Sequence, residues 1–348
     1  MAINIHDIDM KKCASCLLGK RFEHRTCFAN PGMDPFALKA KKELGKKVSD
    51  GTYKYEDCDC FCGANDSILV SETDRYGNYY PLVLCKKCGI MRANPRLNET
   101  AYVDFYAHDY RVLYGNKISD RDERYEKKIK QAEDLYNFVS RHIGIPRGTV
   151  VFDIDCNMGS FLVPFHKNGC EVMGADYDEE CIEFGRKKTG LNLEIGGVEK
   201  LKGFGKKADI VILNHVLEHF LDIDKELKSI RDIIKPGGFI FIAVPGTLWW
   251  IKNMCASDIM ALLQNAHLWQ LTMDSLRYVM ECCGFEFVYG DERVRAIFKA
   301  TDVYRNKKNP PKDEYKKTSN YIMGIEHRHL PRIYARKFLE LVGVKKHG

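Results

Sequence analysis

Five cysteines between residues 58 and 88 have the type and spacing of metal ligands. Cys85 and Cys88 form a C-x-x-C knuckle followed by a glycine, and Cys60 and Cys62 form a shorter knuckle ahead of them. Four thiolates from two turns suit tetrahedral zinc, and four protein ligands leave no open coordination position. The spacing therefore predicts a structural zinc site at Cys60, Cys62, Cys85 and Cys88, with Cys58 as an alternative ligand to Cys60.

A second group of candidate ligands lies nearer the N-terminus. Cys13, Cys16, His24 and Cys27 follow the pattern C-x2-C-x7-H-x2-C. These ligand types and this knuckle spacing suit a second zinc ion. Free side chains and an iron–sulfur cluster remain alternatives, although three cysteines and a histidine are an uncommon set for such a cluster.

A different chemistry is indicated by the stretch "VVFDIDCNMGSFLVPF" at 151–166. An apolar strand ends at Asp153, a turn of small and polar residues follows, and an apolar helix begins near Ser160. Nucleotide-binding turns favour glycine because the backbone needs positive φ there. Here Asp155 and Asn157 occupy two such positions and only Gly159 is a glycine. Asp and Asn tolerate left-handed geometry, so we expect the backbone path of the turn to be kept.

The elements that would position this loop form a repeating pattern. Apolar strands alternate with amphipathic helices, which predicts a doubly wound, mostly parallel sheet. Ligands of such sheets bind beyond the carboxyl ends of the strands. The second strand ends at Asp176, where a carboxylate can accept ribose hydroxyls or, alternatively, cap a helix. The predicted strands are 149–154, 171–176, 192–195, 208–213, 239–244, 285–289 and 294–299.

Five motifs in the expected order resemble the class I S-adenosylmethionine-dependent methyltransferases. They are the loop at 153–161, Asp176, "HVLEH" at 215–219, "KPGG" at 235–238 and "HLWQLTMDSLRYVMECCGF" at 267–285. The resemblance implies a Rossmann-like seven-stranded sheet that binds S-adenosylmethionine at its first loop. The cofactor-binding residues that it implies are Asp153, Asp155, Asn157, Gly159, Asp176, Tyr177, Glu199, Asn214 and His215.

The residues after the second cysteine knuckle carry a further resemblance. "NPR" at 94–96 and "YR" at 110–111 are similar to the zinc-ribbon leader that precedes the methyltransferase domain in bacterial enzymes of sugar and surface-polysaccharide modification. This likeness implies a nucleotide-sugar or glycan acceptor and makes Arg96, Tyr110 and Arg111 candidate acceptor contacts. For each of them, structural capping or salt bridging is an equal alternative. Another small metabolite as acceptor, or a non-catalytic binding subunit, remains the alternative function.

Two histidines are candidates for the base that deprotonates an acceptor, because histidine is the commonest general base. We favour His267, which follows the fifth strand, over His219, whose alternative role is to order the cofactor loop. Trp249 could stack on a sugar ring or simply close the core.

Composition and charge restrict the partners. The chain has 348 residues, of which 45% are hydrophobic and 29% charged. It has no apolar run long enough to span a membrane and no apolar signal core at its start, so we expect a cytoplasmic protein.

Residues 301–348 hold twelve basic and five acidic residues, which favours a phosphate-bearing acceptor or peripheral contact with the inner membrane face. Nucleic acid is the least favoured partner because no aromatic–basic stacking motif is present. The oligomeric state is not predicted.

These features predict five regions along the chain. They are a Cys/His segment at 1–50, a zinc ribbon at 51–97, a helical connector at 98–146, a methyltransferase domain at 147–300 and a basic, mostly helical extension at 301–348.

Overall fold

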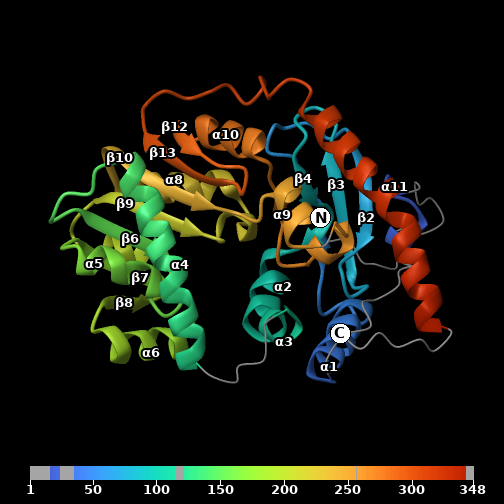
Figure 1. The fold of residues 1–348 in the computed structure, drawn as a ribbon, viewed down its shortest axis with the longest axis horizontal. Helices are drawn as coiled ribbons and strands as arrows, with labels where there is room; N and C mark the ends of the chain where they lie inside the picture. The colour runs from blue at the N-terminus through green and yellow to red at the C-terminus, as the bar shows by residue number, and fades with distance from the viewer. Residues whose placement is uncertain (1–15, 24–34, 115–120, 256, 342–348) are drawn as a thin grey trace. The chain divides into compact units, whose positions relative to one another are not determined.

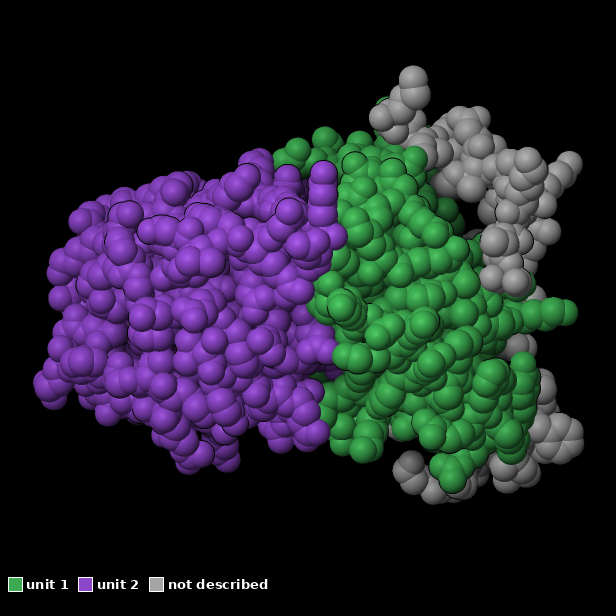
Figure 2. All heavy atoms as spheres, turned by 90° about the horizontal axis from the view of Figure 1, so that it is seen from above, with its two compact units in different colours: residues 1–116, 247–272, 310–348 green, residues 117–246, 273–309 purple. Residues whose placement is uncertain are grey.

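The computed structural model describes residues 16–23, 35–114, 121–255 and 257–341. Its contacts divide the chain into two compact units, shown in different colours in Figure 2. Unit 1 comprises residues 1–116, 247–272 and 310–348, and unit 2 comprises residues 117–246 and 273–309. Within the described residues, no helix combines the length and the apolar character that crossing a membrane requires.

Unit 2 is built on a seven-stranded sheet, which confirms the predicted fold class (Figure 1). The strand order is β12-β13-β10-β9-β6-β7-β8. The strands from β10 to β8 are parallel, and β13 runs antiparallel to both of its neighbours. The strands are β6 (Val150–Ile154), β7 (Glu171–Asp176), β8 (Asn192–Ile195), β9 (Ala208–Asn214), β10 (Ile234–Ala243), β12 (Phe285–Gly290) and β13 (Arg295–Ala300).

The strand order reverses between β6 and β9, because the chain adds β7 and β8 on one side of β6 and later strands on the other. Such a switch point is where open α/β sheets bind their ligands. The core strands are apolar on both faces, and all five residues of β6 are buried. The helical elements of unit 2 are α4 (Arg121–His142), η5 (Ser160–Leu162), α5 (Val163–Lys167), α6 (Glu179–Thr189), α7 (Val198–Lys202), η6 (Leu217–His219), α8 (Ile223–Ile233) and α10 (Met273–Cys282).

Unit 1 contains a four-stranded antiparallel sheet in the order β11-β4-β3-β2 and a two-stranded sheet of β1 and β5. The strands are β1 (Tyr55–Glu56), β2 (Ser67–Thr73), β3 (Tyr79–Cys85), β4 (Met91–Ala93), β5 (Arg96–Leu97) and β11 (Trp269–Gln270). The helical elements are η3 (Lys20–Phe22), α1 (Pro35–Ser49), α2 (Glu99–Asp104), the π-helical turn η4 (Phe105–Asp109), α3 (Tyr110–Tyr114), α9 (Thr247–Asn253), η7 (Ile259–Leu262) and α11 (Glu314–Leu341).

Both units are discontinuous in sequence. Residues 247–272 belong to unit 1, and residues 98–146 are divided between the two units. Long-range pairing contributes to this division, since β11 completes the sheet of β2, β3 and β4.

A buried ion cluster joins three distant segments of unit 1. The Arg21 guanidinium donates to the carboxylates of Glu326 at 2.5 Å and Asp258 at 2.9 Å. The Arg21 and Glu326 side chains are 8% and 2% exposed, so each charge depends on its partner for stabilisation.

Candidate functional site

The loop after β6 keeps the backbone path expected of a glycine-rich turn. Asp155, Asn157 and Gly159 have φ values of 55°, 53° and 68°, which places all three in the left-handed region. Asp and Asn therefore fill two of the three left-handed positions, as expected. Gly159 is required for a second reason, because a Cβ there would lie 2.8 Å from a methyl carbon of Leu193.

Asp176 ties this loop to the end of β7. Its carboxylate accepts the backbone N–H of Asn157 and that of Asp178, each at 2.7 Å. The two bonds fix the carboxylate between the loop after β6 and the start of the segment after β7. Asp176 thus orders the loop, a role that the sequence did not predict, in addition to any role in ribose binding.

The surrounding protein raises the pKa of two further carboxyl groups in the loop. Burial, together with the charges of Asp176 and Asp155, raises the pKa of the Asp153 carboxyl well above its usual range. Desolvation by the surrounding protein, with the charge of Asp176, raises the pKa of Asp155 to about 7. The Asp155 side chain is nevertheless exposed, so solvent screens part of this effect. The loop is therefore an acidic site that favours a cationic ligand group.

Lys128 is a site residue that the sequence reading missed. It lies on α4, and its ammonium is 5.5 Å from the centroid of the Phe161 ring, directly after the loop. Burial lowers the pKa of Lys128, whereas the charges of Asp153 and Asp176 favour its protonated form. A lysine on an amphipathic helix gives no sequence signal for such a position, because most such lysines are solvated.

Three buried polar atoms of the loop fit a bound ligand. Asp153 Oδ2, Asn157 Oδ1 and Ser160 Oγ have no hydrogen-bond partner among the residues that the structure describes. Unpaired buried polar atoms are costly, and a ligand with an ammonium group and hydroxyls would pair them. S-adenosylmethionine carries such groups, so the residues present fit this cofactor.

The remaining residues expected to bind the cofactor lie at the carboxyl ends of neighbouring strands or just beyond them. Tyr177 is 72% exposed directly after β7. Glu199, at the start of α7, accepts the backbone N–H of Gly197 at 2.8 Å. Asn214 ends β9, and His215 follows it in the left-handed region with a φ of 61°.

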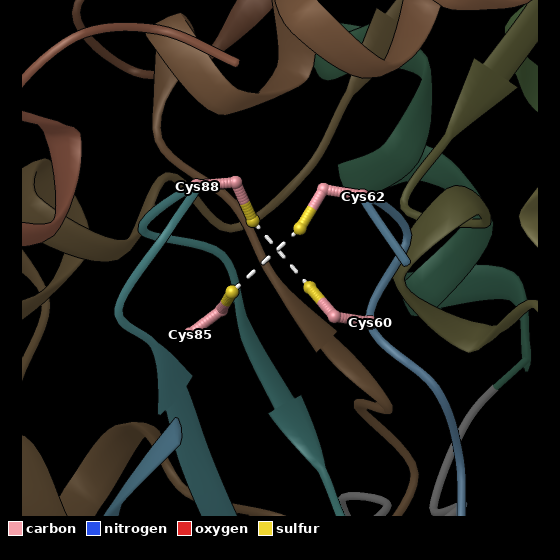
Figure 3. Close-up of side chains that lie close together, drawn as sticks. All are labelled: Cys60, Cys62, Cys85 and Cys88. Atoms are coloured by element: carbon pink, nitrogen blue, oxygen red, sulfur yellow. Dashed lines mark hydrogen bonds between the residues drawn. The ribbon is translucent and has the colours of Figure 1, made fainter. Parts of the chain in front are cut away.

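The four cysteines of the predicted zinc site point toward a common centre in unit 1 (Figure 3). Their sulfur atoms all lie within 4.8 Å of one another, with Cys60 and Cys88 at 3.4 Å and Cys62 and Cys85 at 3.7 Å. The contact with Cys60 lowers the pKa of the Cys62 thiol to about 7. Four buried thiols at this spacing fit a tetrahedral zinc ion.

The alternative ligand Cys58 does not join this cluster. Its thiol donates instead to the carbonyl of Asp59, and its backbone N–H donates to the Asn94 side chain at 2.6 Å. The structure therefore selects Cys60, because the turn at 60–63 directs Cys60 and Cys62 to the same side. The second candidate group lies mostly outside the described residues, since only Cys16, which is buried, is described, and Cys13, His24 and Cys27 are not.

The two histidine candidates for the base belong to different compact units. His219 ends η6 in unit 2, whereas His267 is 7% exposed in unit 1, where its Nε2 contacts the Gln264 side-chain amide. Arg96 forms an ion pair with Glu56 at 3.2 Å, which is the salt-bridge alternative.

The other three candidates lie on helices of unit 1. Tyr110 stacks on Tyr106 with ring centroids 4.7 Å apart, and Trp249 lies edge-on to Trp250. Arg111 lies in α3.

Comparison with known proteins decides the family. Residues 115–289, half of the chain, match a family model described as a methyltransferase domain. The chain belongs to the methyltransferase family. The matched range contains the loop after β6, Asp176 and Lys128.

Curated relatives cover a shorter stretch. The chain is 31% identical over 107 residues to a ubiquinone biosynthesis O-methyltransferase of Bartonella bacilliformis, which spans 29% of this chain and 43% of the relative. It is 32% identical over 102 residues to the protein of the same name from Sinorhizobium fredii, covering 28% and 41%. The chain thus spans about two fifths of the length of these relatives.

Solved structures are similar at low sequence identity. The magnesium protoporphyrin IX methyltransferase of Synechocystis PCC 6803 aligns with a TM-score of 0.40 at 15% identity, covering 58% of this chain and 99% of that one.

Proposed function

We propose that the protein is an S-adenosylmethionine-dependent methyltransferase that methylates a hydroxyl oxygen of a small-molecule or glycan acceptor. The observation that carries this proposal is the loop after β6, with its left-handed Asp155, Asn157 and Gly159, in a chain of the methyltransferase family. Transfer to oxygen is supported by the curated relatives, which are named O-methyltransferases.

The loop residues would hold the cofactor through complementary charge and hydrogen bonds. When bound, S-adenosylmethionine supplies a methyl group already activated by its sulfonium. Asp153 and Asn157 would pair their free oxygens with donors of the methionine end. Asp176, at the end of β7, would accept ribose hydroxyls, and Tyr177, Glu199, Asn214 and His215 would border the rest of the cofactor.

Lys128 would balance the charge of this site. The acids of the loop favour the cationic ammonium and sulfonium, whereas the carboxylate of the methionine end needs a cation. Lys128 on α4 places its ammonium group beside the Phe161 ring, and in its protonated form it would balance the charge of that carboxylate and of Asp153.

The acceptor must lose a proton when a hydroxyl oxygen is methylated, and we assign this step to His267. His219 is the alternative base, although its position in η6, two residues beyond Leu217, suits a role in ordering the cofactor loop. The enzyme otherwise mainly aligns donor and acceptor, because the methyl group is already activated.

For the acceptor we propose a nucleotide-sugar or glycan, because the leader that contains Arg96, Tyr110 and Arg111 resembles that of sugar-modifying enzymes. Trp249 would offer a stacking face, and the basic residues of 301–348 would bind a phosphate group. A phenolic acceptor is the second candidate, favoured by the name of the curated relatives. We also propose that Cys60, Cys62, Cys85 and Cys88 hold a structural zinc ion.

An acceptor screen tests the function. Purified protein and S-adenosylmethionine are incubated with nucleotide sugars, glycan fragments and dihydroxyphenols, and products are detected by the mass gain of one methyl group. We expect methylation of one acceptor class, abolished in Asp153→Ala. Cofactor binding without any methylated product across these classes would exclude the proposed acceptors, and no cofactor binding would favour a non-catalytic role.

A further inference from the structure

The short segment that carries His267 is an integral part of the cysteine-bearing sheet of unit 1. Residues 269–270 form β11, which pairs with β4 so that Trp269 lies opposite Arg92 and Gln270 opposite Met91. One step earlier, the backbone N–H of Ala93 donates to the carbonyl of Leu268 at 2.9 Å. The backbone immediately after His267 therefore has the fixed register of a β-ladder.

Two buried tyrosines fix the backbone on the other side. The Tyr102 hydroxyl donates to the carbonyl of Ala266 at 2.9 Å, and the Tyr80 hydroxyl donates to the carbonyl of His267 itself. Tyr80 and Tyr102 are 1% and 6% exposed. The two bonds hold consecutive carbonyls, so both peptide groups that flank the Cα atom of His267 are clamped by side chains of other elements.

Two of the metal-ligand candidates lie at the end of β3 and in the turn that joins it to β4. Tyr80 lies on β3, which ends at Cys85, and β4 begins at Met91, three residues after Cys88. The turn between them is closed by a bond from the Cys85 N–H to the Ile90 carbonyl at 3.0 Å. A zinc ion bound by Cys85 and Cys88 would therefore fix the β3–β4 turn, from which the strands that carry Tyr80 and Ala93 extend.

We propose that the four-stranded sheet with its zinc ion is the platform that positions His267, with Tyr80 and Tyr102 as its positioning residues. The inference rests on the proposed role of His267 as base. A zinc ion held by the four cysteines would take no part in the chemistry; the β3–β4 turn that it would fix, with Tyr80 and Tyr102, would set the position of the imidazole. Small displacements of a catalytic group are costly, with roughly 10²-fold losses for shifts of about 1 Å.

Hydrogen exchange tests the positioning without relying on activity. Amide exchange of residues 263–271 is compared in wild type, Tyr80→Phe, Tyr102→Phe and the double variant. Tyr55→Phe is the matched control, because Tyr55 is a buried tyrosine of unit 1 whose hydroxyl donates to a different carbonyl, that of Tyr79 at 3.3 Å. We expect 263–271 to lose protection in the double variant and in zinc-depleted protein, with Tyr55→Phe unchanged.

The reference for global unfolding is α1 in the same unit. If α1 also loses protection on zinc removal, the whole unit has unfolded, and only the tyrosine variants then test whether Tyr80 and Tyr102 position residues 263–271. Unchanged protection of 263–271 in the double variant would overturn the proposal.

A second experiment measures turnover in a double-mutant cycle between the tyrosine substitutions and His267→Ala. We expect the double tyrosine variant to lower kcat by roughly 10–100-fold in the wild-type background, with unchanged affinity for S-adenosylmethionine. In the His267→Ala background the same substitutions should have no further effect, because the residues act through His267. An equal loss in both backgrounds would contradict the positioning role. Wild-type protein that methylates nothing would instead refute the proposed function, and the exchange experiment would still decide the positioning.

Discussion

The two candidate sites of this molecule differ in what completes them. In unit 1, the four thiol sulfur atoms converge within 4.8 Å of one another. In unit 2, the loop after β6 is ordered by the hydrogen bond from the Asn157 N–H to Asp176, whereas buried polar atoms of Asp153, Asn157 and Ser160 have no partner among the described residues. The first has the donor set of a metal site, and the second presents polar atoms that a ligand could pair.

The two sites therefore tolerate different kinds of amino-acid substitution. Metal ligands are restricted by chemistry, because a tetrahedral zinc site needs four donor atoms of the right kind. The loop is restricted by backbone conformation, which several residue types can satisfy. Asp155 and Asn157 show this, since they adopt φ values of 55° and 53° without being glycine.

The largest effect should come from breaking the thiol cluster. Cys85→Ser should remove one equivalent of zinc, measured by elemental mass spectrometry. Structural zinc binding is worth on the order of 10 kcal/mol, similar to the whole stability of a domain. We therefore expect unit 1 to lose its cooperative thermal transition. Cys58→Ser is the matched control and should keep both metal and stability, because Cys58 lies outside the cluster. A zinc-free Cys85→Ser protein with wild-type stability would show that the four-cysteine cluster does not stabilise unit 1 through a bound metal ion.

The next largest effect concerns chemistry and not stability. His267→Ala should lower turnover by roughly 10²–10⁴-fold, the usual contribution of positioned proton transfer. Affinity for S-adenosylmethionine, measured by calorimetry, should be unchanged, because His267 is assigned to the acceptor and not to the cofactor. Should His219→Ala abolish turnover with cofactor binding intact while His267→Ala is nearly normal, the base has been assigned to the wrong histidine.

A smaller effect is expected from the carboxylate that orders the loop. Asp176→Ala leaves the N–H groups of Asn157 and Asp178 without their acceptor and removes a candidate partner of the ribose. Such losses cost about 1–3 kcal/mol, so the Kd for S-adenosylmethionine should rise by roughly 5–150-fold. Thermal stability of unit 1 should not change, and a fall there would show that the two sites are not independent.

The smallest effect should be a pH-dependent gain in stability. The raised pKa of Asp155, about 7, means that the folded state favours the protonated carboxyl. Its contribution is present at low pH and is lost as the pH rises through 7. Asp155→Asn, which keeps a residue tolerant of left-handed geometry, should therefore stabilise the ligand-free protein more at pH 8 than at pH 5 in thermal unfolding. An equal shift at both pH values would mean that Asp155 titrates normally.

Local sequence was sufficient for features that depend on a few adjacent residues. The strands of the seven-stranded sheet could be predicted because each is a short apolar run between helical patterns. The preference for left-handed geometry at Asp155 and Asn157 followed from residue type. The choice between Cys58 and Cys60 could not be made, because it depends on the direction of one turn relative to Cys85 and Cys88.

Features that depend on residues far apart in the chain could not be predicted from the local sequence. Nothing in "HLWQ" indicates that Trp269 and Gln270 pair with β4, which lies almost 180 residues earlier in the chain. Lys128 was missed for the same reason, since its position beside Phe161 results from the packing of α4 on the loop. The division into two discontinuous units also depends on such long-range pairing, which is invisible in local periodicity.

The most direct test of the central claim is calorimetric titration of wild-type protein with S-adenosylmethionine. We expect one S-adenosylmethionine-binding site per chain, in unit 2, with a lower affinity in Asp153→Ala and Asp176→Ala. The Cys58→Ser protein, altered only in unit 1, should bind as wild type does. Saturable binding at one equivalent with this pattern is the expected result. No detectable binding by the zinc-loaded wild-type protein, or binding that survives both aspartate substitutions unchanged, would contradict the account.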